Sequence, residues 1–182
     1  MKSVGEAMSI GRTFKEAFLK GVRSLELGKE GRLFGHAALP GAPPDSATTE
    51  ELDAALRRRL SVPTDRRMWA VFEALERGWS TERIHDLTKI DPWFLQQFAD
   101  LVELRRTAEL VGLRDMSPDL LRTLKRAGFG DGELAHILQV DESAVREKRN
   151  ERGLRTVYKR IDTCAAEFES FTPYMYLSLI HI

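Results

Sequence analysis

Residues 87–95 read LTKIDPWFL, and this stretch decides the fold of the region around it. Asp91 is suited to the N-cap of a helix, and Pro92 can take its first position because proline has no amide hydrogen to leave unpaired. Ile90 before the cap and Leu95 after it have the spacing of a hydrophobic staple. The stretch therefore predicts that a helix starts here.

The same helix-start signals recur on both sides of this stretch. Ser117 is followed by Pro118, and Asp141 lies between apolar residues, so each can cap a following helix. Thr48 and Glu51 have the spacing of a capping box, in which two residues satisfy each other's backbone amides. Cap, staple and apolar period agree at successive boundaries, which predicts a run of helices.

These signals make residues 48–156 an all-α domain, which we expect to fold as an orthogonal multi-helix bundle without help from its flanks. Apolar residues recur at helical spacing and predict its core. The predicted core residues are Leu52, Leu56, Phe72, Leu75, Ile84, Leu87, Phe94, Phe98, Leu121, Leu124, Ile137 and Val145.

A faint internal repeat emerges when the chain is compared with itself at an offset of 50 positions. Gly78 then meets Gly128, and Asp91 meets Asp141. The matches fall on helix stops, caps and core positions, so the similarity of any two helical hairpins explains them as well as duplication does. We use the repeat only to predict two similar helical units, with Gly78 as a left-handed helix stop.

The flanks differ from the middle. A helix from Thr13 to Leu27 is predicted, because Thr13 and Glu16 again have capping-box spacing. Its expected apolar face consists of Phe14, Phe18, Val22 and Leu25. Residues 28–47 show no sustained period and are interpreted as a linker. From residue 157 onward β-favouring residues replace the helical stripe, which indicates the unfinished start of another domain.

Composition points to a globular protein of the cytoplasm. Lysine plus arginine and aspartate plus glutamate number 28 each, so no strong overall field would draw the chain to nucleic acid or an anionic membrane. No apolar run approaches the roughly 18 residues that span a bilayer. Cys164 is the single cysteine, which excludes an internal disulfide, and we interpret it as a small buried side chain.

The search for catalytic chemistry finds no candidate. No two of the histidines have the spacing of metal ligands; they are His36, His85, His136 and His181. The glycine-containing segments 28–31 and 128–132 lack the lysine and hydroxyl of a phosphate-binding loop. We therefore predict no catalytic residue, no cofactor-binding residue and no metal site in this chain.

Residues 128–153 look like a helix-turn-helix, which makes a DNA-binding regulator the main alternative. Its second helix is basic through Arg146, Lys148, Arg149 and Arg152. Glu142, Glu147 and Glu151 lie on the same helix and can pair with these charges. The related hairpin places Trp93 and Phe94 where a DNA reader needs polar groups, which favours core or subunit contact. A free-standing helical adaptor is a further alternative.

Three motifs stand out: MKSVGEAMSIGR at residues 1–12, LTKIDPWFL at residues 87–95 and VYKRIDTCAAEF at residues 157–168. Together they resemble one family, the carbamoyl phosphate synthetase large subunit. MKSVGEAMSIGR, residues 1–12, resembles the stretch MKSVGEVMAIGR that closes its first ATP-grasp unit. LTKIDPWFL is similar to a signature of its connection, or oligomerisation, domain. VYKRIDTCAAEF, residues 157–168, resembles VYKRVDTCAAEF at the beginning of its second unit, and residues 172–176 continue the match.

This resemblance implies a division of the chain: residues 1–27 end the first ATP-grasp unit, 48–156 form the connection domain, and 157–176 start the second unit. It implies a parent that makes carbamoyl phosphate from bicarbonate, glutamine-derived ammonia and two ATP, for arginine and pyrimidine synthesis. The parent would use ATP with Mg or Mn. Its partners would be the rest of the large subunit, the glutaminase small subunit and further copies of itself, with no specific nucleic acid and no membrane.

The resemblance carries over no site residue, because the family's glycine-rich lids and acidic metal ligands have no counterpart in this sequence. We therefore expect this segment to be architectural and inactive by itself. Residues 177–182, LSLIHI, depart from the family and are interpreted as a non-native tail, whose reverse translation resembles a transposase sequencing adapter. Met1 is compatible with an internal methionine of a longer reading frame.

Overall fold

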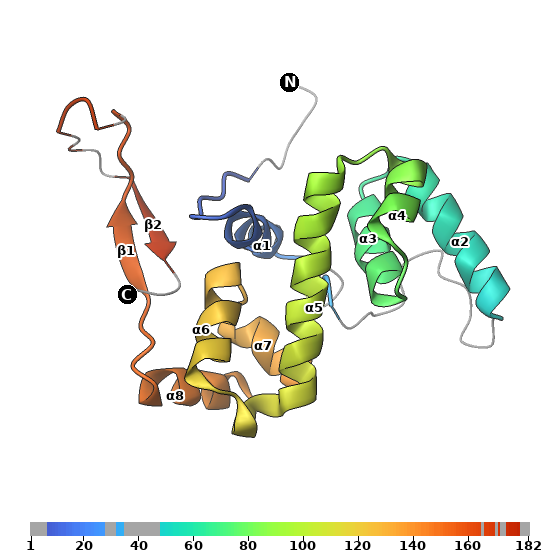
Figure 1. The fold of residues 1–182 in the computed structure, drawn as a ribbon. Helices are drawn as coiled ribbons and strands as arrows, with labels where there is room; N and C mark the ends of the chain where they lie inside the picture. The colour runs from blue at the N-terminus through green and yellow to red at the C-terminus, as the bar shows by residue number, and fades with distance from the viewer. Residues whose placement is uncertain are drawn as a thin grey trace. The chain divides into compact units, whose positions relative to one another are not determined.

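The computed structural model describes residues 7–27, 32–34, 48–164, 166–169, 171 and 174–178. The helices in these ranges are α1 (Phe14–Ser24), α2 (Thr49–Ser61), α3 (Arg67–Glu76), α4 (Thr81–Thr88), α5 (Pro92–Asp115), α6 (Pro118–Ala127), α7 (Asp131–Leu138) and α8 (Glu142–Glu151). The strands are β1 (Val157–Arg160) and β2 (Met175–Ser178) (Figure 1). The predicted all-α middle is confirmed. None of the described helices is long and apolar enough to cross a membrane.

The chain divides into two compact units, and the division falls inside α5, between residues 107 and 108. One unit holds α2, α3, α4 and the first part of α5. The other holds α1, the last part of α5, α6, α7, α8 and both strands. Helix α5 is interrupted at Gly112, whose φ of 70° and ψ of 165° suit a residue without a Cβ atom.

The core of the α2–α4 unit is built around Phe72 of α3, which is fully buried. Its ring lies 5.3 Å from that of Phe98 in α5 and 5.5 Å, edge-on, from that of Phe34. Leu33 and Phe34 fall in the segment interpreted as a linker, yet both are buried. This short apolar anchor shows no period because it belongs to no helix; the other linker residues, 28–31 and 35–47, lie outside the described ranges.

The predicted repeat is confirmed in the backbone. Helices α4 and α7 begin and end at positions 50 residues apart in the numbering. Both end at left-handed residues in equivalent positions, Lys89 with φ 58° and Gln139 with φ 53°. The preceding turns match as well, because Gly78 and Gly128 have φ of 80° and 108°. Two similar helical units therefore follow each other along the chain.

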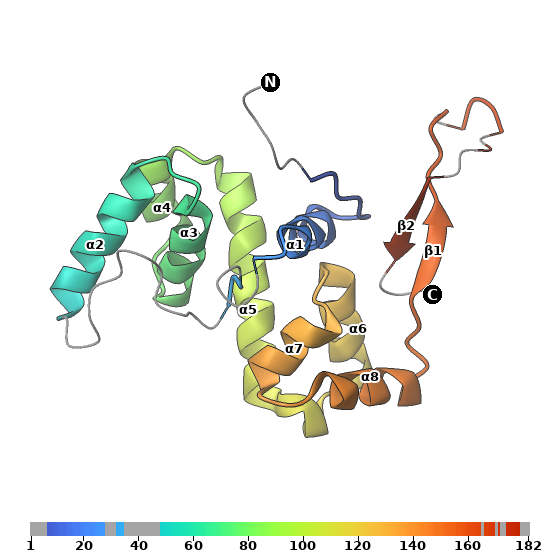
Figure 2. The same cartoon turned by 180° about the vertical axis from the view of Figure 1, so that it is seen from behind.

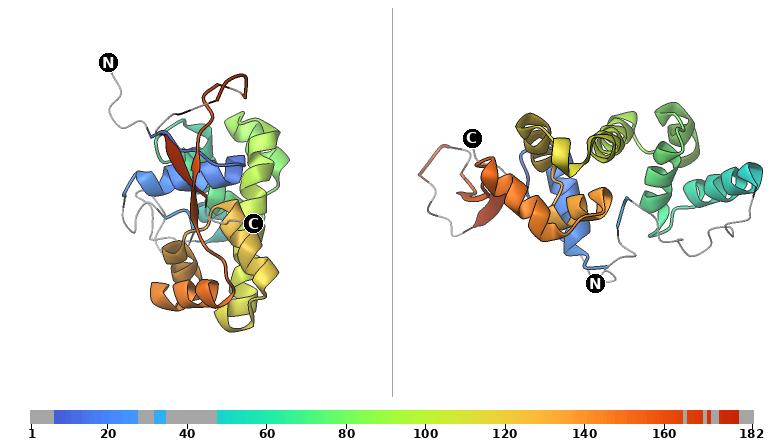
Figure 3. Two further views of the ribbon diagram at one scale, coloured as in Figure 1. Left: turned by 90° about the vertical axis from the view of Figure 1, so that its left-hand side faces the viewer. Right: turned by 90° about the horizontal axis from the view of Figure 1, so that it is seen from below.

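Helix α1 packs against α6 within its unit (Figures 1 and 3), but with a face different from the predicted one. The buried residues of α1 are Glu16 and Leu19, whereas Leu25 is 42% exposed. Glu16 is accommodated because its carboxylate accepts hydrogen bonds from the Arg12 amide and from Lys20. A paired carboxylate thus occupies a core position that apolar periodicity does not reveal.

Helices α7 and α8 pack against each other in the same unit, and α8 lies crosswise to α6 (Figure 2). Strands β1 and β2 pair antiparallel, with Val157 opposite Ser178 and Arg160 opposite Met175. Strand β2 therefore includes residues 177 and 178 of the segment interpreted as a non-native tail. Residues 179–182 lie outside the described part of the chain.

The predicted caps hold at most helix starts. Thr48 and Glu51 form the complete capping box, and the side chain of Ser117 accepts the expected amide bond. The side chain of Ser80 caps α4 in the same way. Asp91 accepts from the amide of Trp93 at 2.8 Å. The expected caps differ in detail elsewhere: the Thr13 hydroxyl accepts from Glu16, whose carboxylate turns to Arg12 instead, and Asp141 occupies the N-cap position without a side-chain bond.

The predicted core is confirmed except at three positions. Leu52 and Leu87 are half-buried, and Phe94 is wrong, because 40% of its surface is exposed. The other nine predicted residues are buried: Leu56, Phe72, Leu75, Ile84, Phe98, Leu121, Leu124, Ile137 and Val145. Helical spacing identifies an apolar face but does not say whether the protein's own core covers it.

The buried ring of Phe34 provides a test of its anchoring role. Replacing Phe34 by alanine should destabilise the α2–α4 unit by about 3 to 5 kcal/mol, because a large cavity would open beside Phe72. Leu110→Ala is the control, since Leu110 is 87% exposed and should change stability by less than about 0.5 kcal/mol. Urea unfolding measures both variants; equal losses would show that residues 32–34 do not anchor the unit.

Candidate functional site

His85 and the cysteine take structural positions. His85 Nδ1 lies 2.7 Å from the carbonyl oxygen of Ile90, so this imidazole braces the turn after α4. Cys164 is half-buried, not fully buried as predicted, because it lies in the surface connection after β1. Its backbone amide donates a hydrogen bond to the side chain of Asp162. Within the described ranges no three His, Cys, Asp or Glu residues are grouped to hold a metal; His36 and His181 lie outside those ranges.

The basic side chains of α8 are largely engaged within their own unit. Arg146 pairs with Glu142 at 2.7 Å, and Lys148 donates to the carbonyl oxygen of Arg114 at 3.0 Å. Arg149 donates to Asp131 and to the carbonyl oxygen of Leu154. Three of the four basic residues considered for DNA contact therefore bond to acceptors of this chain. These bonds would have to break before the side chains could bind phosphates.

A buried charge network joins α6, α7 and α8. Lys125 is 1% exposed and donates to Asp131 Oδ1 at 2.7 Å. Asp131 Oδ2 accepts from Arg149 Nε at 3.2 Å, so one carboxylate serves two cations. Sequence reasoning missed this network, although a lysine one residue after Leu124 in an apolar stripe is a signal of a buried ammonium that needs a partner.

The network shifts the pKa values of its members. Burial lowers the pKa of the Lys125 ammonium below its ordinary value, and the charge of Asp131 opposes this effect. Burial alone would raise the pKa of Asp131, but the charges and hydrogen bonds of Lys125 and Arg149 together hold it below its ordinary value. The carboxylate is thus ionised over the physiological range and acts as the structural counter-ion of both cations.

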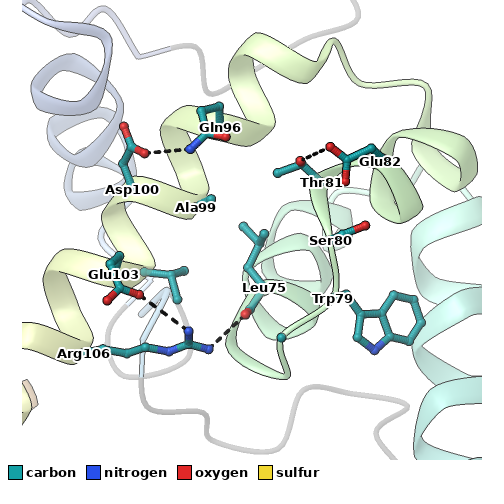
Figure 4. Close-up of a pocket in the computed structure, with 12 residues that line it drawn as sticks. Leu75, Trp79, Ser80, Thr81, Glu82, Gln96, Ala99, Asp100, Glu103 and Arg106 are labelled. Atoms are coloured by element: carbon teal, nitrogen blue, oxygen red, sulfur yellow. Dashed lines mark hydrogen bonds and ion pairs between the residues drawn. The ribbon is translucent and has the colours of Figure 1, made fainter.

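One open pocket lies in the α2–α4 unit, between the end of α3, the start of α4 and α5 (Figure 4). Arg106 crosses it and donates to the carbonyl oxygens of Leu75 and Glu76 at 3.1 and 2.8 Å, which caps the end of α3. Gln96 donates to Asp100 at 2.9 Å on the same wall. These polar groups bond to one another and to the backbone, as structural contacts do.

Trp93 and Phe94 form an aromatic pair on the surface at the start of α5. Their ring centroids lie 5.0 Å apart, edge to face, and the residues are 54% and 40% exposed. Both follow the cap at Asp91 directly, so the rigid first turn of α5 presents them. These two residues were expected to lie either in the core or in a contact between subunits, and the exposure of their rings favours the contact.

Two similar helical units, one of which presents a surface aromatic pair, place the chain in the class of all-α domains. A family model described as the oligomerisation domain of the carbamoyl-phosphate synthetase large chain matches residues 6–153. The chain therefore belongs to the carbamoyl-phosphate synthetase large-chain family, as its three motifs suggested.

Individual relatives agree. The chain is 42% identical to the "Carbamoyl phosphate synthase large chain, N-terminal section" of Aquifex aeolicus, over 98% of this chain and 29% of that protein. It is 44% identical to the large chain of Synechocystis sp., over 97% of this chain and 15% of that protein. It is 46% identical to that of Rhodopirellula baltica, over 97% and 16%. The chain thus spans less than a third of these relatives, and none of these matches supports a DNA-binding regulator.

The charge network predicts a pH-dependent loss of stability. Because the pKa of Asp131 is lower in the folded than in the unfolded state, its contribution is present above the unfolded pKa and is lost as pH falls through the folded value, which lies below 3.8. Asp131→Asn should cost about 3 kcal/mol at neutral pH, since it leaves the Lys125 ammonium buried without its counter-ion. The difference from wild type should narrow as the medium is acidified below pH 3.8.

Thermal unfolding across this pH range measures the effect. Asp119→Asn is the matched control, because Asp119 pairs with Arg122 at 2.6 Å but its side chain is 91% exposed, and such pairs contribute little. If the control lost as much stability as Asp131→Asn, or if the Asp131→Asn difference were independent of pH, the network would not have the assigned role.

Proposed function

We propose that this chain is the architectural connection domain of a carbamoyl phosphate synthetase large chain, together with short parts of the units on either side. The observation that supports this most directly is the family match over residues 6–153, which covers the described helices. Physical support comes from its buried charges, because Lys125 and Asp131 pair with each other at 2.7 Å and so serve the structure.

The activity of the whole protein is part of this proposal. By its family the parent is an ATP-dependent carbon–nitrogen ligase that is supplied with ammonia from glutamine and makes carbamoyl phosphate from bicarbonate and two ATP. ATP with Mg or Mn would bind outside this segment. The product would serve arginine and pyrimidine synthesis in the cytoplasm.

The proposed partners are the rest of the large chain, further copies of it and the glutaminase small subunit. The Trp93–Phe94 pair is the surface that we assign to the rest of the large chain, because most of the length of the relatives lies outside this segment. Exposed aromatic pairs are costly in water and are stabilised when a neighbour covers them.

The division of the chain also remains a proposal. We place the C-terminal boundary of the connection domain near residue 156, where the helices give way to β1. We move the N-terminal boundary, predicted at residue 48, to a position before α1, because α1 packs against α6 and the family match already begins at residue 6. These two observations argue for including α1 in the domain.

The proposal predicts that the isolated chain is inactive. The purified 182 residues should show no bicarbonate-dependent ATP hydrolysis and no carbamoyl phosphate synthesis, because nucleotide and metal would be held by other parts of the parent. A coupled ATPase assay with and without bicarbonate measures this, with the full-length large chain as positive control. Turnover clearly above the blank in the isolated chain would refute an architectural role.

A second prediction concerns the aromatic pair in two contexts. Trp93→Ser should change the stability of the isolated chain by less than about 0.5 kcal/mol, because the ring is already half exposed. In the full-length large chain it should lower the melting temperature by several degrees, since a covered ring contributes roughly 2 kcal/mol or more. Calorimetry on both proteins provides the comparison. Equal small effects would remove Trp93 from any contact with the rest of the large chain.

A further inference from the structure

Helix α1 is held firmly against the turn between α6 and α7. A Cβ atom built on Gly128 would lie 2.9 Å from the Cα atom of Glu16, so the two backbones approach as closely as a glycine permits. Arg23 Nη1 donates to the carbonyl oxygen of Gly128 at 2.6 Å from the same helix. The position of α1 relative to this turn is therefore fixed by backbone contact as well as by side chains.

From this fixed helix the Lys20 ammonium reaches three separate acceptors. It donates to Glu16 Oε1 at 2.8 Å, to the carbonyl oxygen of Ile10 at 2.8 Å and to the carbonyl oxygen of Leu177 at 2.5 Å. The three bonds use all of its donors. Its nitrogen also lies 5.3 Å from the centre of the Tyr176 ring, a distance at which a cation is attracted to an aromatic face.

These acceptors belong to three segments that are distant in the sequence. Ile10 precedes α1, Glu16 is on α1, and Leu177 is on β2, 157 residues from Lys20. The acceptor on β2 is a backbone carbonyl, so the contact does not depend on which side chain stands at position 177. The side chain of Lys20 is 15% exposed, and water competes weakly for such an ammonium.

The strands that Lys20 reaches need support from outside. Each has four residues, and an isolated two-stranded hairpin is marginally stable in water. Contacts to the helical part of the unit therefore decide how well the hairpin is ordered, and the charge-assisted bond from Lys20 is among the stronger kinds of hydrogen bond.

We infer that Lys20 is a positioning residue that couples the segment before α1 to strand β2, so that a displacement of one is transmitted to the other. Under the proposed function β1 and the first two residues of β2, Met175 and Tyr176, come from the second synthetase unit, and the meaning of the coupling for catalysis rests on that proposal. The coupling itself belongs to this chain and is testable in it without any enzymatic assay.

The test is a double-mutant cycle read out by fast amide hydrogen exchange of β1 and β2 in the whole chain. Ser9→Ala removes the 2.7 Å bond from Ser9 to the carbonyl oxygen of Ala17 and loosens the segment before α1. With Lys20 present, this change should speed exchange in the strands severalfold. Lys20→Met should speed it about tenfold, because a charge-assisted bond is lost, and adding Ser9→Ala should then have no further effect.

Two more variants complete the design. Lys89→Met is the control, because Lys89 is an exposed lysine at the end of α4 whose loss should leave the strands unchanged. Tyr176→Leu keeps the ammonium and its three hydrogen bonds, and should speed exchange about threefold; it also answers the question if Lys20→Met does not fold. The inference is overturned if Ser9→Ala has the same effect with and without Lys20, or if neither Lys20→Met nor Tyr176→Leu alters exchange in the strands.

Discussion

The reversal of the chain at Gly78 and at Gly128 is the constraint on which both helical units depend. In each turn the residue after the glycine bonds back to the preceding helix, Trp79 to the carbonyl of Ala74 at 3.0 Å and Phe129 to that of Leu124 at 3.1 Å. The left-handed glycine lets the chain turn sharply enough to bury the following aromatic side chain. The buried ring then fixes the direction in which the next helix of each unit starts.

The two turns have similar backbone conformations, but their glycines are required for different reasons. A Cβ atom at Gly78 would meet nothing within 4 Å, so glycine is required there for its conformation alone. At Gly128 a side chain would also collide with α1. The interiors of the two units also differ. At an offset of fifty residues, Lys125 corresponds to Leu75, which is buried, and Asp131 corresponds to Thr81. A buried ion pair adds little net stability, but it distinguishes one unit from the other and so opposes mispairing of similar helices.

Sequence reasoning captured what is local and missed what is long-range. Helix starts such as Asp91 and stops such as Gly78 are determined within a few residues, which is why caps and the repeat could be predicted. Glu16 in the core of α1 was missed, because its burial depends on partners that periodicity does not count. Phe94 was assigned to the core because an apolar face has the same spacing whether the chain itself or a neighbour covers it.

The candidate site follows the same logic. The absence of catalytic motifs was a statement about local patterns, whereas the contacts that organise this domain join residues far apart: Arg23 with Gly128, Asp131 with Arg149, and Lys20 with Leu177. In each contact, a cationic side chain donates a hydrogen bond to an oxygen atom of another segment. Cations on long flexible stems can span gaps between helices that apolar side chains leave open. A domain whose proposed work is to hold neighbouring units in register would need such spanning contacts at its ends, and α1 carries two of the three.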